Sequence, residues 1–218
     1  MIINDLPCPI GESLAGKDAA GTLVNTDKCG RPYVIPANRM TALLRGNKQR
    51  FTGKPLIGAL MRNTSGLTML GKRLVQIVRA AGYTMTQEFD GYSATLANKG
   101  VGLLDPYLPT TGVVDDDIAW VFFGGPLPCL LPLVASDHTA DIAVGDGLVA
   151  ATGTTTGVTT SGRITHVRFV NSTVGGTQAS LNAYDMSVGL LGRAMSARTS
   201  QETTAGADLL VDFFIKYW

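Results

Sequence analysis

The residues that could act as a nucleophile, a base or a catalytic acid are few and widely spaced. The sequence contains two histidines, His138 and His166. His138 directly follows Asp137, so the two could form a base with an orienting carboxylate, whereas His166 lies in a strand pattern and is expected at a surface or interface. No spacing typical of a zinc protease, a serine hydrolase or a phosphate-binding loop occurs. We therefore expect no catalytic residues and no enzyme activity; a small β-rich hydrolase using His138 and Asp137 is the less favoured alternative.

Metal and disulfide chemistry is similarly weak in the sequence. Six aspartates between positions 115 and 146 could supply oxygen ligands for calcium, but their spacing is not that of an EF-hand. A solvated turn, or an acidic patch that meets basic residues of a neighbour, is the simpler interpretation. The three cysteines, Cys8, Cys29 and Cys129, are odd in number and form no CxxC pair. We expect buried thiols in a protein made in a reducing cytoplasm, with no metal and no cofactor.

Charge is sparse and unevenly distributed. Charged residues make up 16% of the chain, which suggests a surface partly covered by partners. Between Lys28 and Gln87 there are eleven basic residues and no acidic one, whereas residues 110–218 hold twice as many acidic as basic residues. The basic stretch could face an acidic protein surface or phosphate, or could be neutralised by the acidic half of the same molecule or a neighbouring copy. Direct nucleic-acid binding is not expected, because no recognised motif or dense basic cluster is present.

The elements that would position these residues differ between the two halves. Residues 1–37 are expected to form an extended arm, because four prolines and many turn residues oppose a helix. A basic α+β region is expected over 38–110. It begins with a short helix over 38–46 and contains an amphipathic helix over 67–81, for which a pair of β-strands is the alternative. No signal peptide and no membrane span are expected.

Residues 111–218 are predicted to form a β-rich domain, a sandwich or small barrel, so that the chain is mainly β in its C-terminal half and α+β overall. Gly124, Gly125 and Pro126 are expected to end the first strand, and Gly145, Asp146 and Gly147 to form a tight turn. Strands are expected over 83–89, 118–123, 127–134, 164–170 and 209–218, and a loop or weak hairpin over 152–160. In the last strand, Leu209, Val211, Phe213, Ile215 and Tyr217 share one face.

Four segments of the C-terminal half occur in an informative order. They are Asp117-Ile118-Ala119-Trp120-Val121-Phe122-Phe123 followed by Gly125-Pro126, then Val144-Gly145-Asp146-Gly147-Leu148-Val149, then Val188-Gly189-Leu190-Leu191-Gly192-Arg193-Ala194-Met195, and finally Ala205-Gly206-Ala207-Asp208-Leu209-Leu210-Val211-Asp212. This order resembles that of the capsid decoration, or cement, proteins of tailed bacteriophages, which similarly place a Gly-Asp turn, a Gly-x-Ala step and a Leu-Val-Asp strand in succession. The resemblance covers residues 115–218, about half of the chain.

The resemblance implies a virion structural protein on the outer capsid surface, present as a homo-trimer that bridges neighbouring capsid subunits through contacts with the major capsid protein. A minor virion component, such as a head-fibre base, vertex or tail protein, is the alternative. The expected capsid-binding residues are Arg39, Arg45, Lys48, Arg50, Arg62, Lys72 and Arg73. The expected core or trimer-interface residues are Trp120, Phe122, Phe213, Ile215 and Tyr217.

Overall fold

The computed structural model describes residues 6–36, 54–79, 85–92, 100–130, 142–150, 154–155, 158–159, 164–166, 191–198 and 208–214. Within these residues the regular elements are β-strands and one three-residue 3-10 helix, Thr26–Lys28, joined by turns and loops. The strands are β1 (Pro32–Ile35), β2 (Leu56–Asn63), β3 (Leu74–Arg79), β4 (Met85–Tyr92), β5 (Gly100–Leu104), β6 (Ile118–Leu130), β7 (Gly147–Ala150), β8 (Thr154–Thr155), β9 (Val158–Thr159), β10 (Ile164–His166), β11 (Gly192–Ala194) and β12 (Asp208–Phe214).

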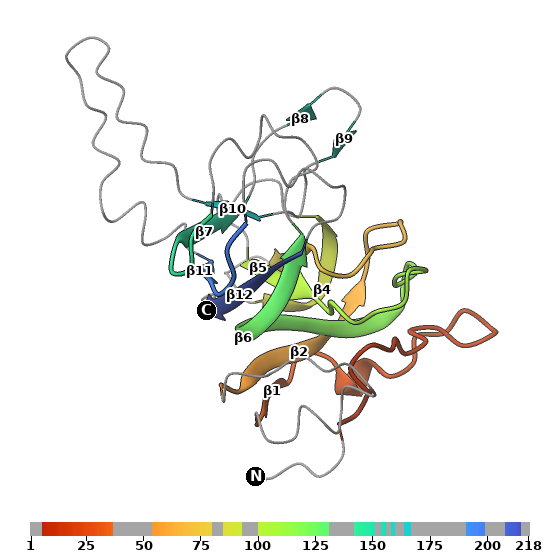
Figure 1. Cartoon of the computed structure of the whole chain (residues 1–218). Coiled ribbons are helices and arrows are strands. Elements are labelled where there is room, and N and C mark those ends of the chain that lie inside the picture. Colours follow the sequence, from red (N-terminus) through yellow and green to blue (C-terminus); the bar gives the residue numbers. More distant parts are fainter. Residues whose placement is uncertain are drawn as a thin grey trace.

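Five strands close into a small barrel. β6 pairs with both β2 and β5, β5 pairs with β3, and β3 pairs with β4, all antiparallel. A short parallel pairing between β4 and β2 completes the ring. β1 adds to the outside of this ring as an antiparallel neighbour of β2. Figure 1 shows β1 and β2 running together below β6. The ring joins strands from positions 56 to 130, so it is built largely from the half of the chain that was expected to contain helices.

The long strand β6 belongs to the barrel and to a second sheet. Its first part pairs with β2, and its last part, Gly124–Leu130, pairs with β12. From β12 the second sheet continues through β11 and β7 to β10, while β8 and β9 form a separate hairpin. Gly125 permits the change of direction, because it has a φ of 99° and a side chain there would collide with the carbonyl of Pro55. β6 therefore connects the two parts of the fold.

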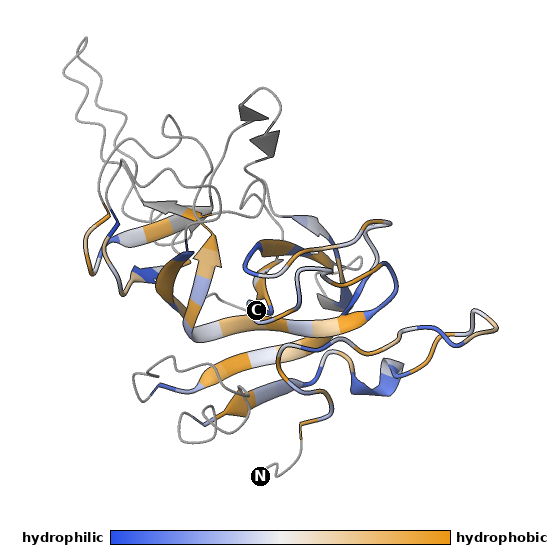
Figure 2. Ribbon diagram, turned by 45° about the vertical axis from the view of Figure 1, so that its right-hand side comes forward, coloured by the Kyte–Doolittle hydropathy of each residue, from blue (hydrophilic) through white to orange (hydrophobic). Residues whose placement is uncertain are grey.

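β6 is buried on both faces, which explains its unbroken apolar sequence. Ile118, Trp120 and Phe122 point to one side of the strand, and the alternating residues Val121 and Phe123 point to the other. The hydrophobic colouring along this strand is visible in Figure 2.

The two faces of β6 contribute to two separate cores. The inner cluster fills the barrel and consists of Ala59, Met61, Met69, Val75, Ile77, Phe89, Leu104, Val113, Ala119, Val121 and Phe123. The outer cluster includes Cys8, Ile10, Tyr33, Leu60, Leu103, Trp120, Phe122, Leu127, Leu148, Val211 and Phe213. It joins the outside of the barrel to the N-terminal segment and to the second sheet.

The N-terminal segment 6–36 packs against the barrel. The indole Nε1 of Trp120 donates a hydrogen bond to the carbonyl of Cys8 (2.9 Å), and Leu14 forms a backbone bridge with Ile118. The ring of Tyr33 meets that of Trp120 edge-on, with 5.3 Å between the ring centroids. Cys8, Cys29 and Cys129 are buried cysteines. Burial raises the pKa of Cys8 to about 12 and that of Cys29 to about 11, so both thiols are protonated at neutral pH.

The described residues are mainly β, as predicted for the C-terminal half, but the α-containing N-terminal region and the α+β class predicted for the whole chain are not seen among them. The predicted helix over 67–81 is wrong: residues 67–73 form a loop and bridge, followed by strand β3. The alternative of β-structure was the better prediction, because Leu74 faces the outer cluster whereas Val75 and Ile77 face the barrel interior. The predicted helix over 38–46 lies outside the described residues.

Several predicted strands occur with different limits. The two strands expected over 118–123 and 127–134 are one continuous strand to Leu130, because Gly125 bends the chain without ending the pairing. The last strand buries Leu209, Val211 and Phe213 on one face, as predicted, and ends its described part at Phe214. Ile215 and Tyr217 lie outside the described residues. The possible hairpin in 152–160 is present as β8 and β9.

Candidate functional site

The site with the most unusual geometry lies where two connections meet at one end of the barrel. Residues 64–73 connect β2 to β3, and residues 105–117 connect β5 to β6. Met69 and Val113 exchange backbone hydrogen bonds of 2.8 Å in both directions, which ties the two connections together. We call this region, residues 64–73 with 105–117, the loop end. It is held by backbone pairing and by the buried amide at the end of β2.

Asn63 is that buried amide. Its Nδ2 donates to the carbonyls of Leu67 (2.7 Å), Val113 and Val114 (3.1 Å each), and its Oδ1 accepts from the N–H and hydroxyl of Ser65. Because the side chain serves both connections, it fixes the loop end relative to the barrel.

Lys72 has a strained backbone at the junction between the loop end and β3. Its φ is 64°, in the left-handed region that a residue with a side chain seldom adopts. The conformation is held because the Lys72 N–H donates to the carbonyl of Leu104 and the Lys72 carbonyl accepts from the N–H of Leu130. Its Nζ lies 2.5 Å from Oδ2 of Asp208 on β12. Lys72 therefore links the loop end, the barrel and the second sheet.

Arg73 follows this strained residue and is held differently. Its guanidinium carbon lies 4.8 Å from the centre of the Tyr92 ring, a cation–π geometry. The hydroxyl of Tyr92 accepts a 2.6 Å hydrogen bond from the N–H of Leu70, which fixes the ring. The Nε of Arg73 is buried without a hydrogen-bond partner, and Arg73 forms no salt bridge within the described part of the chain. Its positive charge is therefore not matched by a described carboxylate.

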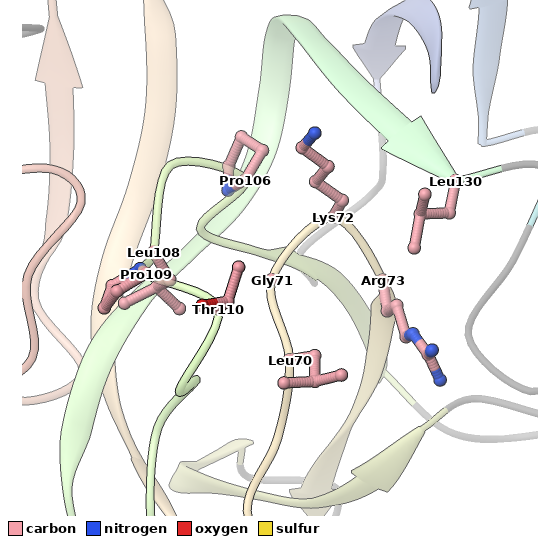
Figure 3. Close-up of a pocket in the computed structure, with 9 residues that line it drawn as sticks. All are labelled: Leu70, Gly71, Lys72, Arg73, Pro106, Leu108, Pro109, Thr110 and Leu130. Carbon is pink, nitrogen blue, oxygen red and sulfur yellow. The ribbon is translucent and has the colours of Figure 1, made fainter. Parts of the chain in front are cut away.

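A pocket of about 290 Å³ lies beside these two basic residues (Figure 3). Its lining combines apolar side chains from both connections with the two cations and contains no acidic residue. The lining residues are Leu70, Gly71, Lys72, Arg73, Pro106, Leu108, Pro109, Thr110 and Leu130. This volume is at the lower limit of small-molecule sites, so it suits one or two side chains better than a large cofactor.

Exposed apolar side chains surround the same loop end. Leu67 is 67% exposed, Val114 is 50% exposed, and Leu70 reaches from the pocket to the surface. We call Leu67, Leu70 and Val114 the loop-end patch. The sequence pattern had placed Leu67 and Leu70 on the apolar face of a helix, where burial was expected.

A second exposed apolar group lies at the opposite end of β2. Val34 on β1 is paired with Ile57 on β2, and both Ile57 and Phe214 on β12 are paired with Gly124. Residues paired across strands project from the same face, so Val34, Ile57 and Phe214 form one exposed row, the strand patch. Ile57 lies six positions before Asn63 in β2, a distance of about 20 Å in a strand.

The predicted capsid-binding residues have different environments. Arg62 on β2 forms a salt bridge with Glu88 on β4 and is largely buried, and Lys72 is paired with Asp208. Of the described members of the set, Arg73 alone forms no salt bridge within the described residues. Arg39, Arg45, Lys48 and Arg50 lie outside the described residues, so a common surface of all seven residues stays a prediction.

The uneven charge of the sequence is partly neutralised within the molecule. Lys17 pairs with Asp116, Lys54 with Asp212 and Lys72 with Asp208, and each of these salt bridges joins the basic half of the sequence to the acidic half. At these three positions, the acidic half of the same chain supplies the counter-charge, one of the interpretations that the sequence allowed.

The predicted core or trimer-interface residues that are described lie inside the fold. Trp120, Phe122 and Phe213 are all in the outer cluster. Trp120 and Phe122 stack with 6.0 Å between ring centroids. Phe214, the neighbour of Phe213, is the exposed aromatic residue on β12. These buried rings therefore support the sheet that carries the strand patch.

Asp105 is the buried acid of the site region. It has no exposed surface and accepts hydrogen bonds from the N–H groups of Gly11 (2.6 Å) and Tyr107 (2.9 Å). Burial raises the pKa of its carboxyl to about 6, and the two backbone donors act in the opposite direction. The carboxyl joins the N-terminal segment to the loop end. Sequence reasoning missed this role, and the only signal was an aspartate before proline at the end of an apolar strand.

The described residues contain no group of three His, Cys, Asp or Glu side chains placed to hold a metal ion. They also contain no helix of the length and hydropathy needed to cross a membrane. His138 and Asp137, the base and the orienting carboxylate considered from the sequence, lie outside the described residues.

No protein-family model, curated protein or solved structure matches the chain. Its function is therefore inferred from its own residues and geometry.

Proposed function

We propose that this chain is a virion structural protein that binds the outer surface of a phage head and stabilises it by bridging neighbouring capsid subunits. The observation that carries the proposal is the pair of exposed apolar patches at opposite ends of β2. A bridging protein needs at least two contact surfaces at a fixed separation, and the length of about 20 Å from Ile57 to Asn63 in β2 keeps the two patches apart.

The frame between the patches is suited to transmitting load. β2 is hydrogen-bonded to β1 and β6 over most of its length, and β6 continues into the second sheet. Buried polar groups such as Asn63 and Asp105 are used to hold connections together. This arrangement supports a role in rigid binding.

The two patches have separate roles in the proposal. The strand patch is a flat apolar row on paired strands and forms the contact between copies in a trimer. The loop-end patch, with its pocket and Arg73, contacts the major capsid protein. Each copy then makes modest capsid contacts that the trimer multiplies through effective concentration. The protein resides on the outer capsid surface after synthesis in the host cytoplasm.

The copy number of the chain in purified phage particles tests the function. We expect mass spectrometry to give hundreds of copies, close to one for each major capsid protein subunit. A dozen copies or fewer would instead indicate a vertex, head-fibre base or tail component, and absence from particles would overturn the proposal.

Three matched substitutions test the division of roles. Phe214→Asp places a charge in the strand patch and should reduce the oligomer mass measured by light scattering. Leu67→Asp should leave that mass unchanged and reduce binding to heads that lack the protein. Val144→Asp is the control, because Val144 is as exposed as Leu67, at 67%, and belongs to neither patch. Equal behaviour of all three variants would contradict the assigned roles.

A further inference from the structure

We propose that the loop-end pocket recognises an acidic segment of the capsid partner, with an apolar side chain in the pocket and a neighbouring carboxylate on Arg73. The inference rests on the proposed function and identifies what its capsid-binding surface recognises. Three features of the described residues carry it: the size and lining of the pocket, the unmatched charge of Arg73, and the rigidity of the segment that presents both.

The pocket accepts an aliphatic side chain. Leu70 comes from one connection, Pro106, Leu108 and Pro109 come from the other, and Leu130 from β6 closes a further side (Figure 3). The lining is mainly apolar, and its volume of about 290 Å³ corresponds to one or two side chains. The exposed Leu67 and Val114 extend the apolar surface beyond the pocket, where the flanking residues of a bound segment would lie.

The charge beside the pocket selects an acidic segment. Lys72 is already matched by Asp208, whereas Arg73 has no salt bridge among the described residues and its Nε is buried without a hydrogen-bond partner. A carboxylate can accept hydrogen bonds from the terminal Nη atoms of a guanidinium group, which would match the charge while the buried Nε stays inside the protein. Because no acidic residue lines the pocket, no negative side chain of the lining repels a bound carboxylate.

The site is rigid before it binds. The Tyr92 ring supports the guanidinium of Arg73 and is itself fixed by the N–H of Leu70. Gly71 packs so closely on the carbonyl of Asp105 that a Cβ would lie 2.4 Å from that oxygen. Lys72 is held in a left-handed conformation by hydrogen bonds at both its N–H and its carbonyl. Little conformational entropy is therefore lost in the protein when a segment binds.

A peptide titration tests the chemistry without phage particles. The probe is a five-residue capped peptide with leucine on each side of a central glutamate, and its control has glutamine in place of the glutamate. We expect the glutamate peptide to shift the NMR amide signals of Gly71, Arg73 and Thr110 and to bind about tenfold more tightly than the glutamine peptide. Arg73→Gln, which retains much of the stem over Tyr92, should abolish that difference.

Arg193→Gln provides the matched control, because Arg193 is an exposed arginine on β11 outside the pocket. It should leave the difference between the peptides unchanged. Equal affinity of wild-type protein for the two peptides, or an unchanged difference in Arg73→Gln, would overturn the inference.

Binding to phage heads separates failure of the inference from failure of the function. Thr110→Trp fills the exposed rim of the pocket, and a thermal unfolding curve checks that the variant is folded. If wild-type protein binds heads and both folded Thr110→Trp and Arg73→Gln bind equally well, the function stands and the pocket inference is wrong. If wild-type protein does not bind heads but retains the glutamate preference, the pocket inference stands and the proposed function is wrong.

Discussion

The barrel interior and the layer outside it are both well-packed cores, but they are assembled from different parts of the chain. The inner cluster draws on β2 to β6 and their connections, positions 59 to 123. The outer cluster joins residues as distant as Cys8 and Phe213. The barrel interior thus holds neighbouring strands together, whereas the outer layer holds the N-terminal segment and the second sheet to the barrel.

The two buried polar residues, Asn63 and Asp105, differ in charge as well as in the parts of the chain that they connect. Asn63, at the barrel end, is a neutral amide whose donor and acceptor atoms are both used. Asp105, which reaches the N-terminal segment, is an acid whose charge is desolvated. The hydrogen bonds that Asn63 makes within the barrel should therefore be insensitive to pH. The hydrogen bonds by which Asp105 holds the N-terminal segment should depend on pH.

Removing one large ring from each core gives the largest expected effects. Trp120→Ala and Phe89→Ala should each reduce the free energy of unfolding by about 4 kcal/mol, because each leaves a cavity in a packed core. Urea denaturation measures both losses.

Limited proteolysis then distinguishes the two variants. Trp120→Ala also removes the hydrogen bond to Cys8, so cleavage within residues 6–36 should accelerate in this variant and not in Phe89→Ala. Equal cleavage rates would show that the N-terminal segment does not depend on the outer cluster.

Loss of the Asn63 amide should have the next largest effect. Asn63→Ala leaves the carbonyl of Leu67 and the N–H of Ser65 without this partner, so we expect a loss of about 3 kcal/mol in the free energy of unfolding. Ser65→Ala is the matched control and should cost about 1 kcal/mol. The loss in Asn63→Ala should be the same at pH 5 and pH 7; a marked difference would break the contrast with Asp105.

Asp105 should make the stability of the protein depend on pH over a defined range. Its pKa is raised from 3.8 to about 6 by burial, so the folded state holds the proton more tightly than the unfolded state. Its contribution to stability is therefore fully present below pH 3.8 and is lost as pH rises through about 6, with a magnitude of about 3 kcal/mol.

Urea denaturation from pH 4 to 7 measures this contribution as the difference between wild-type protein and Asp105→Asn. The asparagine variant cannot titrate at this position. Its free energy of unfolding should therefore not show the decrease with rising pH that Asp105 causes in the wild-type protein. Parallel pH profiles for the two proteins would show that Asp105 is not the titrating group.

The strands could be predicted from the sequence where burial alternates simply, and less well where backbone geometry decides. In β12, Leu209, Val211 and Phe213 alternate with more polar positions, so the pattern identified both the strand and its buried face. In residues 67–81 the apolar spacing also fits a helix. The helix prediction failed because Leu67 and Leu70 are exposed, while Leu74 and Val75 point into different cores.

The candidate site depended more strongly on tertiary structure. Lys72 and Arg73 were selected from the sequence as basic residues, but charge alone could not indicate that one has a partner on β12 and the other lies over Tyr92. The loop-end pocket lies between connections about 40 positions apart, so no local pattern contains it.

The division of β6 between two sheets sets an order of events during synthesis. All strands of the barrel have been synthesised once β6 is complete at Leu130, whereas β12 begins only at Asp208. At common translation rates, several seconds pass before the last part of β6 can pair with β12. Pro126 and Pro128 lie in that part, opposite Asp212 and Leu210, and their missing N–H groups face away from β12, because the backbone of Leu210 bonds to Ser196 and Met195 and not to Pro128. The prolines therefore cost the pairing of β6 with β12 no hydrogen bond, and this edge of β6 stays open to pairing until the C-terminal strand is made.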